Sequence, residues 1–148
     1  MMIFYSGEEF LNDEQRDWIE RSLHTVLQQE NLLQAGEVSI SLVSSDEMHE
    51  LNKEYREVDA TTDVLSFPQV SSIEEAQLQS YLFLGDIVIN LGKVAQQAME
   101  YDHSEARELS YLTVHSLYHL LGYDHETDED KALMRAKEKH IMAILEEK

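Results

Sequence analysis

Cysteine is absent from this 148-residue sequence, and proline occurs only once. The lack of cysteine excludes disulfide bonds, thiol catalysis and cysteine-ligated zinc, and it is typical of a reducing compartment. No apolar run approaches the ~18 residues that a membrane-spanning helix needs. Residues 1–15 carry acidic side chains at Glu8 and Glu9, where a signal peptide needs basic and apolar ones. We therefore expect a cytoplasmic protein that has no membrane association.

Basic residues are also scarce, because 11 Lys and Arg stand against 30 Asp and Glu, for a formal net charge of −19 at pH 7. Phosphates would meet a repulsive surface over most of such a molecule. Broad, non-specific binding to nucleic acid is therefore disfavoured, and we expect no binding to DNA. Any phosphate chemistry has to take place in a local basic pocket.

Glycine is limited to five residues, and the sequence shows no low-complexity linker and no internal repeat. The length suits one domain, residues 1–148, because two domains would each be small for a self-sufficient core. Short apolar or alternating segments predict four strands, at residues 2–5, 38–42, 64–67 and 83–89. Helical spacing of apolar residues separates and follows these strands. Strands mixed with helices, without regular β-α-β repetition to the end, predict an α+β fold.

Capping signals mark where the helices are expected to begin. In chain order they are Asn12 with Gln15, Ser44 with Glu47, Asn90, Asp102 with Glu105, and Thr127 or Asp128. The first helix is expected to include Leu33. Gly122 is expected to end the helix that begins near Glu105, in the left-handed conformation. The polar stretch 69–80 is expected to be a loop.

Three of the seven histidines lie within one short segment, at His115, His119 and His125. His115 and His119 are four residues apart on an expected helix, so their side chains share one face and can reach one ion. Gly122 lets the chain turn back, so that His125 can close the site. Three neutral imidazoles leave a fourth tetrahedral position open, which is typical of catalytic zinc sites. The spacing predicts one Zn²⁺ per chain, although nickel, cobalt or manganese could occupy the same site. The alternative is three unrelated histidines, two of them hydrogen-bonded on a half-buried helix.

The same spacing matches the zinc peptidase pattern H-E-x-x-H-x-x-G-x-x-H at every position but one. Those peptidases place a Glu directly after the first His, as the general base for the zinc-bound water. Ser116 stands at that position here, and a serine cannot replace a carboxylate in proton transfer at neutral pH. Either another group serves as the base, or the substrate does not need this arrangement.

A second polar cluster precedes the third expected strand. Asn52 and Arg56 are four residues apart on an expected helix. The guanidinium of Arg56 could hold a phosphate through two parallel hydrogen bonds. The alternative is an ion pair with Glu57, Asp59 or Asp63, of the weak kind that most exposed arginines form.

The segment His115–His125 resembles the signature H-G-x-L-H-L-x-G-y-D-H of the YbeY family, which are bacterial zinc-dependent endoribonucleases involved in rRNA maturation. Two positions depart from the signature: Ser116 replaces the usual Gly, and Tyr118 replaces the usual Leu. The stretch Leu51–Pro68 is similar to another signature of the family, and Leu84–Ile87 is similar to a third. The likeness spans roughly residues 37 to 145.

The resemblance implies a four-stranded mixed sheet, about five helices packed around it, and a zinc-hydrolase-like histidine cleft. It carries the zinc ligands over to His115, His119 and His125. It also assigns catalytic roles to His115 and to Arg56, which is expected across the cleft from the metal. Asn52, Ser66 and Asp86 carry over as members of the motifs, and we favour structural roles for these three.

The resemblance and the histidine spacing together predict a zinc-dependent endoribonuclease that is specific for single-stranded RNA. It would act in 16S rRNA 3′-end processing and in ribosome quality control. Two alternatives stay open. One is a zinc peptidase or other metallohydrolase, which Ser116 weakens, and the other is a non-catalytic, ribosome-associated protein. A chain of charge −19 would not find rRNA unaided, so we expect recruitment by a basic ribosomal protein or a GTPase.

Overall fold

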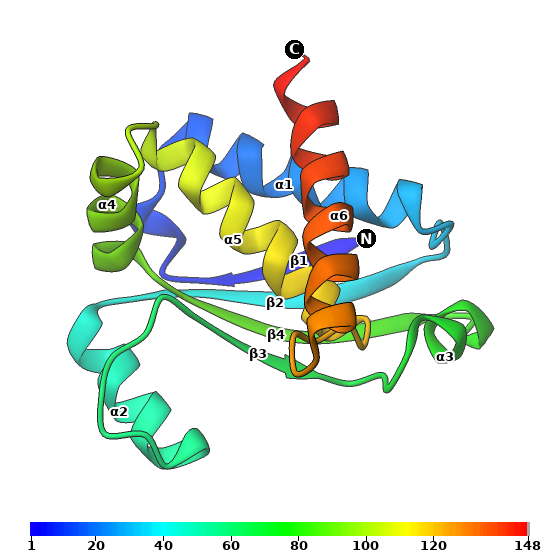
Figure 1. Cartoon of the computed structure of the whole chain (residues 1–148), viewed down its shortest axis with the longest axis horizontal. Helices are drawn as coiled ribbons and strands as arrows, with labels where there is room; N and C mark the ends of the chain where they lie inside the picture. Colours follow the sequence, from blue (N-terminus) through cyan, green and yellow to red (C-terminus); the bar gives the residue numbers. More distant parts are fainter. Residues whose placement is uncertain (148) are drawn as a thin grey trace.

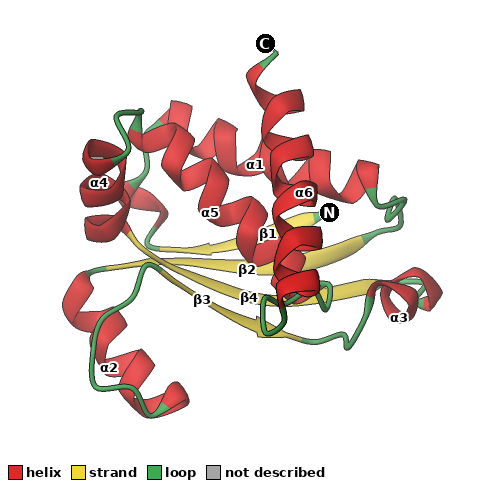
Figure 2. Ribbon diagram, viewed as in Figure 1, coloured by secondary structure: helices red, strands yellow, loops and turns green. Residues whose placement is uncertain are grey.

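A single mixed sheet organises the protein, as described by a computed structural model that covers residues 1–147. The four strands found there are β1 (Met2–Ser6), β2 (Gly36–Val43), β3 (Val64–Pro68) and β4 (Leu82–Asn90). Their order in the sheet is β1-β2-β4-β3 (Figure 2). β1 and β4 are parallel to β2, whereas β3 is antiparallel to β4. The predicted four-stranded mixed sheet and α+β class are therefore confirmed, while Lys148, the end of the predicted domain, lies outside the described residues.

Helices cover both faces of this sheet (Figure 1). In residues 1–147 they are a 3-10 turn, η1 (Glu8–Phe10), and the α-helices α1 (Asp13–Gln29), α2 (Ser45–Arg56), α3 (Ile73–Leu78), α4 (Leu91–Glu100), α5 (Glu105–Leu120) and α6 (Asp128–Glu146). Figure 1 shows α1, α5 and α6 on one side of the sheet and α2 on the other. None of the helices described is both long and apolar enough to cross a membrane.

Two apolar cores of unequal size hold these layers together. The main core joins α1 and α5 to one face of the sheet, with residues such as Leu23, Ile40 and Leu112 almost fully buried. The smaller core lies under α2 and contains Met48, Leu65 and Val88. Because both faces of β4 are covered, its apolar residues follow one another without the alternation seen in β2. The main core thus includes α5, the helix that carries two of the predicted zinc ligands.

Most predicted helix caps are confirmed, and one is wrong. Asn12 and Ser44 form complete capping boxes, and Asn90 and Thr127 are N-caps as expected. The N-cap of α5 is Ser104 rather than Asp102, because the Ser104 hydroxyl accepts the backbone N–H of Arg107 at 3.0 Å. Asp102 lies in the preceding turn with a φ of 54°.

Two other expectations are wrong. The stretch 69–80 contains the short helix α3, which is capped by Ser72 and buries Ala76 against the main core. The first helix does not reach Leu33, which is 74% exposed. It ends at Gln29, and Asn31 then adopts a left-handed conformation with a φ of 60°. This turn buries Leu32 in place of Leu33.

Candidate functional site

The end of α5 and the loop after it bring the three histidines together. His115 and His119 lie one turn apart on α5, and Gly122 reverses the chain with a φ of 96°. The ring centroids are 4.7 Å apart for His115 and His119, 5.1 Å for His119 and His125, and 5.9 Å for His115 and His125. The three rings therefore form one cluster, and His115 and His119 are also hydrogen-bonded on the helix, as the alternative expected.

The three rings lie close together, but their present orientation does not point their nitrogens at one metal ion. As the side chains stand, no three His, Cys, Asp or Glu groups within residues 1–147 are arranged to hold a metal ion. A shared zinc ion would need the rings to turn until three ring nitrogens lie about 2.0–2.1 Å from one point. Zinc binding by this cluster therefore stays a prediction.

Two of the three rings already have a partner on the Nδ1 side. His115 Nδ1 lies 2.6 Å from Oε2 of Glu138, and His119 Nδ1 lies 3.0 Å from the carbonyl oxygen of Tyr123. When Nδ1 of each ring carries the proton, it donates to these oxygens and leaves Nε2 free as a ligand. Metal-binding histidines are usually oriented by such outer contacts to a carboxylate or a carbonyl. The donor set therefore fits a zinc-type ion.

The protonation of the cluster also suits ligand chemistry. Burial lowers the pKa of His119, and the nearby charges of His115 and His125 lower it further. A lowered pKa favours the neutral imidazole, which is the form that binds metals.

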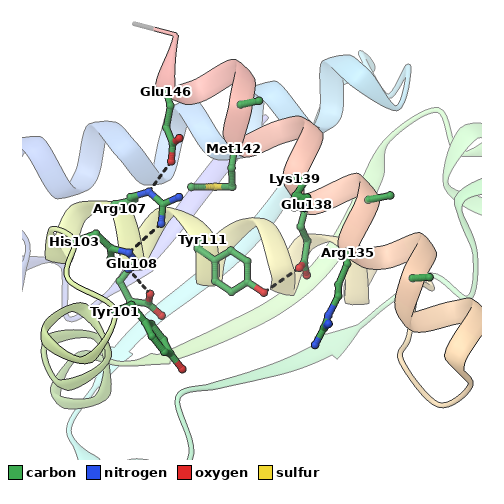
Figure 3. A pocket seen from close by; sticks show the side chains of 13 residues that line it. Tyr101, His103, Arg107, Glu108, Tyr111, Arg135, Glu138, Lys139, Met142 and Glu146 are labelled. Atoms are coloured by element: carbon green, nitrogen blue, oxygen red, sulfur yellow. Dashed lines mark hydrogen bonds and ion pairs between the residues drawn. The ribbon is translucent and has the colours of Figure 1, made fainter.

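Glu138 is a buried carboxylate on α6 that links His115 to Tyr111. It is 5% exposed, and its Oε1 accepts the Tyr111 hydroxyl at 2.9 Å (Figure 3). Burial, followed by the charge of Glu138, raises the pKa of Tyr111 far above its ordinary value. The hydroxyl of Tyr111 therefore stays protonated and keeps donating. Sequence reasoning missed both residues, although Tyr111 lies four residues before His115 and could have been noticed as its neighbour on the helix.

Arg56, the last residue of α2, lines the same cavity of about 530 Å³ as the three histidines. Its Nη2 donates to the carbonyl oxygen of Ser66 at 2.8 Å, and its guanidinium carbon lies 5.6 Å from the ring centroid of Phe67. Within residues 1–147, no carboxylate forms an ion pair with Arg56. Of the three expected alternative partners, which included Glu57, two have other contacts: Asp59 pairs with His49, and Asp63 accepts the backbone N–H of Val64.

Two of the three other motif members, Asn52 and Ser66, have structural contacts. The Asn52 amide donates to the carbonyl of Ala60 at 2.8 Å, which ties the end of α2 to the loop after it. Ser66 is buried in β3, and its carbonyl holds Arg56. Asp86 is exposed on β4. Gly85 beside it has a φ of 125° and lies so close to the Phe67 carbonyl that a side chain would collide with it.

The two departures from the family signature both face the core. Tyr118 is fully buried, and its hydroxyl donates to Oε2 of Glu30 at 3.1 Å. Ser116 is fully buried as well, and its hydroxyl has no hydrogen-bond partner among the described residues. A side chain at position 116 does not line the cavity of the histidines. The carboxylates that do line it are Asp63 and Asp124, which sequence reasoning did not single out as cavity residues.

Comparison with known proteins agrees with this fold and with the sequence motifs. The family model described as endoribonuclease YbeY matches residues 4–146. An endoribonuclease YbeY from Thermoanaerobacter sp. (strain X514) is 48% identical over 136 residues, which cover 86% of this chain and 85% of that protein. Another from Clostridioides difficile (strain 630) is 53% identical over 107 residues, which cover 72% and 69%.

Among solved structures, the solution structure of TM1509 from Thermotoga maritima resembles this protein with a TM-score of 0.65 and 30% sequence identity. The likeness covers 95% of this chain and 87% of that one. The resemblance that the histidine motif suggested is thus confirmed across nearly the whole chain. The chain belongs to the endoribonuclease YbeY family.

Proposed function

We propose that this protein is a zinc-dependent endoribonuclease that cuts single-stranded RNA in the cavity lined by Arg56, His115, His119 and His125. The observation that carries the proposal is the gathering of three imidazoles and one arginine around a single cavity, with outer contacts already made by two of the rings. The relatives named above as endoribonucleases support RNA as the substrate. The histidine donor set supports zinc as the metal.

The histidines, Arg56 and the residues behind His115 would have different roles in the reaction. Zn²⁺ bound by the three imidazoles would supply a Lewis acid for the scissile phosphate. Arg56 faces the same cavity, with one of its five N–H donors held by the Ser66 carbonyl and others available for phosphate oxygens. Its positive charge stabilises the negative charge that develops on the phosphate. The contact of His115 Nδ1 with Glu138, which also accepts the Tyr111 hydroxyl, orients the His115 ring.

The absence of a glutamate at position 116 matters less for RNA than for a peptide. A peptide bond needs a base beside the metal and an acid for the departing amine, and one Glu supplies both in zinc peptidases. RNA carries its own 2′-hydroxyl as a possible nucleophile and has a better leaving group. Because position 116 faces the core, Ser116 leaves that peptidase role unfilled. We therefore expect no hydrolysis of unstructured protein such as casein.

The biological setting that we propose is 16S rRNA 3′-end processing and ribosome quality control. A net charge of −19 opposes unaided binding to rRNA. A basic ribosomal protein or a GTPase bound to the ribosome would bring the cavity to its substrate.

Arg56 provides the test of this function. We expect Arg56→Ala to lower kcat for an unstructured oligoribonucleotide by about 100-fold or more, as loss of a charge-stabilising donor does elsewhere. Arg56→Lys should also be impaired, because an ammonium cannot reproduce the paired hydrogen bonds of a guanidinium. Lys53→Ala, an exposed change on the same helix, is the matched control and should cleave normally. Metal content and Tm should be nearly unchanged in all three variants. Normal cleavage by Arg56→Ala would contradict the proposal.

A further inference from the structure

A second and larger cavity, of about 830 Å³, lies beside α5, between α6 and the turn that joins α4 to α5 (Figure 3). Its lining combines apolar side chains, such as Met142, with three of the protein's 11 basic residues, which are Arg107, Arg135 and Lys139. A chain with so few basic residues has few places where an anion could bind. Three glutamates also line the cavity, so what matters for an anion is which of these charges already have partners.

The acidic residues of the cavity already have partners. Glu108 accepts from Gln97 at 2.7 Å and lies 2.8 Å from a ring nitrogen of His103. Glu146 pairs with Arg107 at 2.5 Å. Glu138 is held by Tyr111 and His115, as described above.

Arg135 and Lys139 differ from these groups, since no ion pair or side-chain hydrogen bond holds either of them within residues 1–147. They lie four residues apart on α6, so both project from the same face of the helix. Both are exposed and line the cavity. An anionic ligand that enters the cavity would therefore meet two available cations on one wall.

The cavity lies next to the histidine cavity along α5, and the two share no lining residue. Tyr111 lines it and is one turn from His115, and the two rings are stacked with centroids 6.0 Å apart. Glu108 and His115 are separated by seven residues, or about 10 Å along the helix. Figure 3 shows Tyr111 between Tyr101 on one side and Arg135 on the other. An extended strand with one phosphate at the histidines could thus follow α5 into this cavity.

We propose that this second cavity is an RNA subsite, in which Arg135 and Lys139 hold backbone phosphates next to the cleaved bond and Tyr101 stacks on a base. Tyr101 is 61% exposed and lies beside the His103 ring, so one face can receive a base. Cations that follow the backbone and aromatic rings that stack on bases are the usual means of binding single strands. The subsite rests on the proposed function, because it holds the part of the same RNA that flanks the cleaved phosphate.

Binding of a labelled, unstructured oligoribonucleotide to the metal-loaded protein tests the subsite. The double variant Arg135→Ala/Lys139→Ala should bind about tenfold more weakly at low salt. The plot of log K against log[salt] should become shallower, with the magnitude of its slope reduced by about 1.4. Each lost phosphate contact removes about 0.7 from that magnitude on single strands. Tyr101→Ala should weaken binding about fivefold or more and leave the salt slope unchanged.

The matched control is Lys53→Ala/Lys93→Ala, which removes the same charge from positions on α2 and α4 that lie outside the cavity. Its affinity for the oligoribonucleotide should stay within twofold of that of the unmodified protein, and its salt slope should be the same. An equal loss in both double variants would show that only net charge matters and would overturn the subsite.

A series of oligoribonucleotides shortened from either end separates this proposal from the proposed function. The unmodified protein should show a lower KM for substrates that are long on one side of the cut. The Arg135→Ala/Lys139→Ala protein should lose that advantage and still cleave the shortest substrate at the normal rate. Normal cleavage with an unchanged KM for the long substrates would overturn the subsite alone. Failure of the unmodified protein to cut any RNA would overturn the proposed function.

Discussion

Oε2 of Glu138 lies 2.6 Å from His115 Nδ1, and this contact gives the predicted metal site an anchor on a different helix. A carboxylate at that position holds the ring and makes the free nitrogen a better ligand. We expect Glu138→Gln to weaken zinc binding by about 10-fold to 100-fold, the usual effect of losing an outer contact to a metal ligand. Competition with a coloured zinc chelator measures this directly and needs no RNA. Glu129→Gln, an exposed change in the first turn of α6, should bind zinc normally. Equal affinity in the two variants would contradict the role of Glu138.

Ser116 supplies a prediction about stability. Its buried hydroxyl has no partner among the described residues, so removal of the hydroxyl should stabilise the fold. Ser116→Ala should raise the free energy of unfolding by about 1 kcal/mol. Ser110 on the same helix is equally buried, but its hydroxyl shares a 2.5 Å hydrogen bond with Ser22, so Ser110→Ala should destabilise the fold. Urea denaturation of the two variants checks the opposite signs, and a loss of stability in Ser116→Ala would contradict this account.

The sequence could predict some of these residues and not others. The histidine pair depends on spacing within one helix, and the chain reversal depends on one glycine, so both could be read locally. Composition alone favoured an ion pair for Arg56, and only the family resemblance placed it across the cleft from the metal. Nothing in the sequence distinguishes Glu138 from the other acidic residues, of which there are 30 in all. It contacts His115 only because α6 packs on α5.

At the scale of elements, local capping chemistry predicted helix starts well, and tertiary contacts decided the rest. The capping boxes at Asn12 and Ser44 are confirmed because all their bonds lie within four residues. Near the start of α5, both Asp102 and Ser104 are residue types that can cap a helix, and it is Ser104 that accepts the backbone N–H of Arg107. The helix α3 is too short to show an apolar period, and burial of Ala76 in the main core stabilises it. Length and pattern alone could not reveal such an element.

The turn after α5 carries the prediction at this scale. Gly122 has a φ of 96°, and a Cβ there would lie 2.8 Å from the Ser71 carbonyl oxygen. Gly122→Ala should therefore destabilise the fold by about 1–3 kcal/mol. It should also weaken zinc binding, because His119 Nδ1 bonds to the carbonyl of Tyr123 next to it. Thermal unfolding and zinc competition test both effects. Gly92→Ala, in α4 at an ordinary φ, should leave zinc affinity unchanged.

At the scale of the whole molecule, the scarcity of positive charge gives the few basic residues at cavities their importance. Arg56 stands at one cavity, and Arg135 and Lys139 stand at the other. The same helix, α5, contributes to both cavities, so the predicted metal site and the proposed subsite lie next to each other along it. The rest of the surface is strongly acidic, so few phosphates can be paired with basic side chains. The salt dependence of RNA binding should therefore be shallow, with a slope of about 0.7 for each basic residue that contacts a phosphate.

Zinc titration of the metal-stripped protein, with cleavage of unstructured RNA as the readout, tests the central claim most directly. The account predicts no cleavage without metal, a linear rise up to one zinc per chain, and a plateau beyond it. The His119→Ala protein should stay inactive at every zinc concentration in that range. Full cleavage by the stripped protein, or by the stripped His119→Ala protein, would contradict the account.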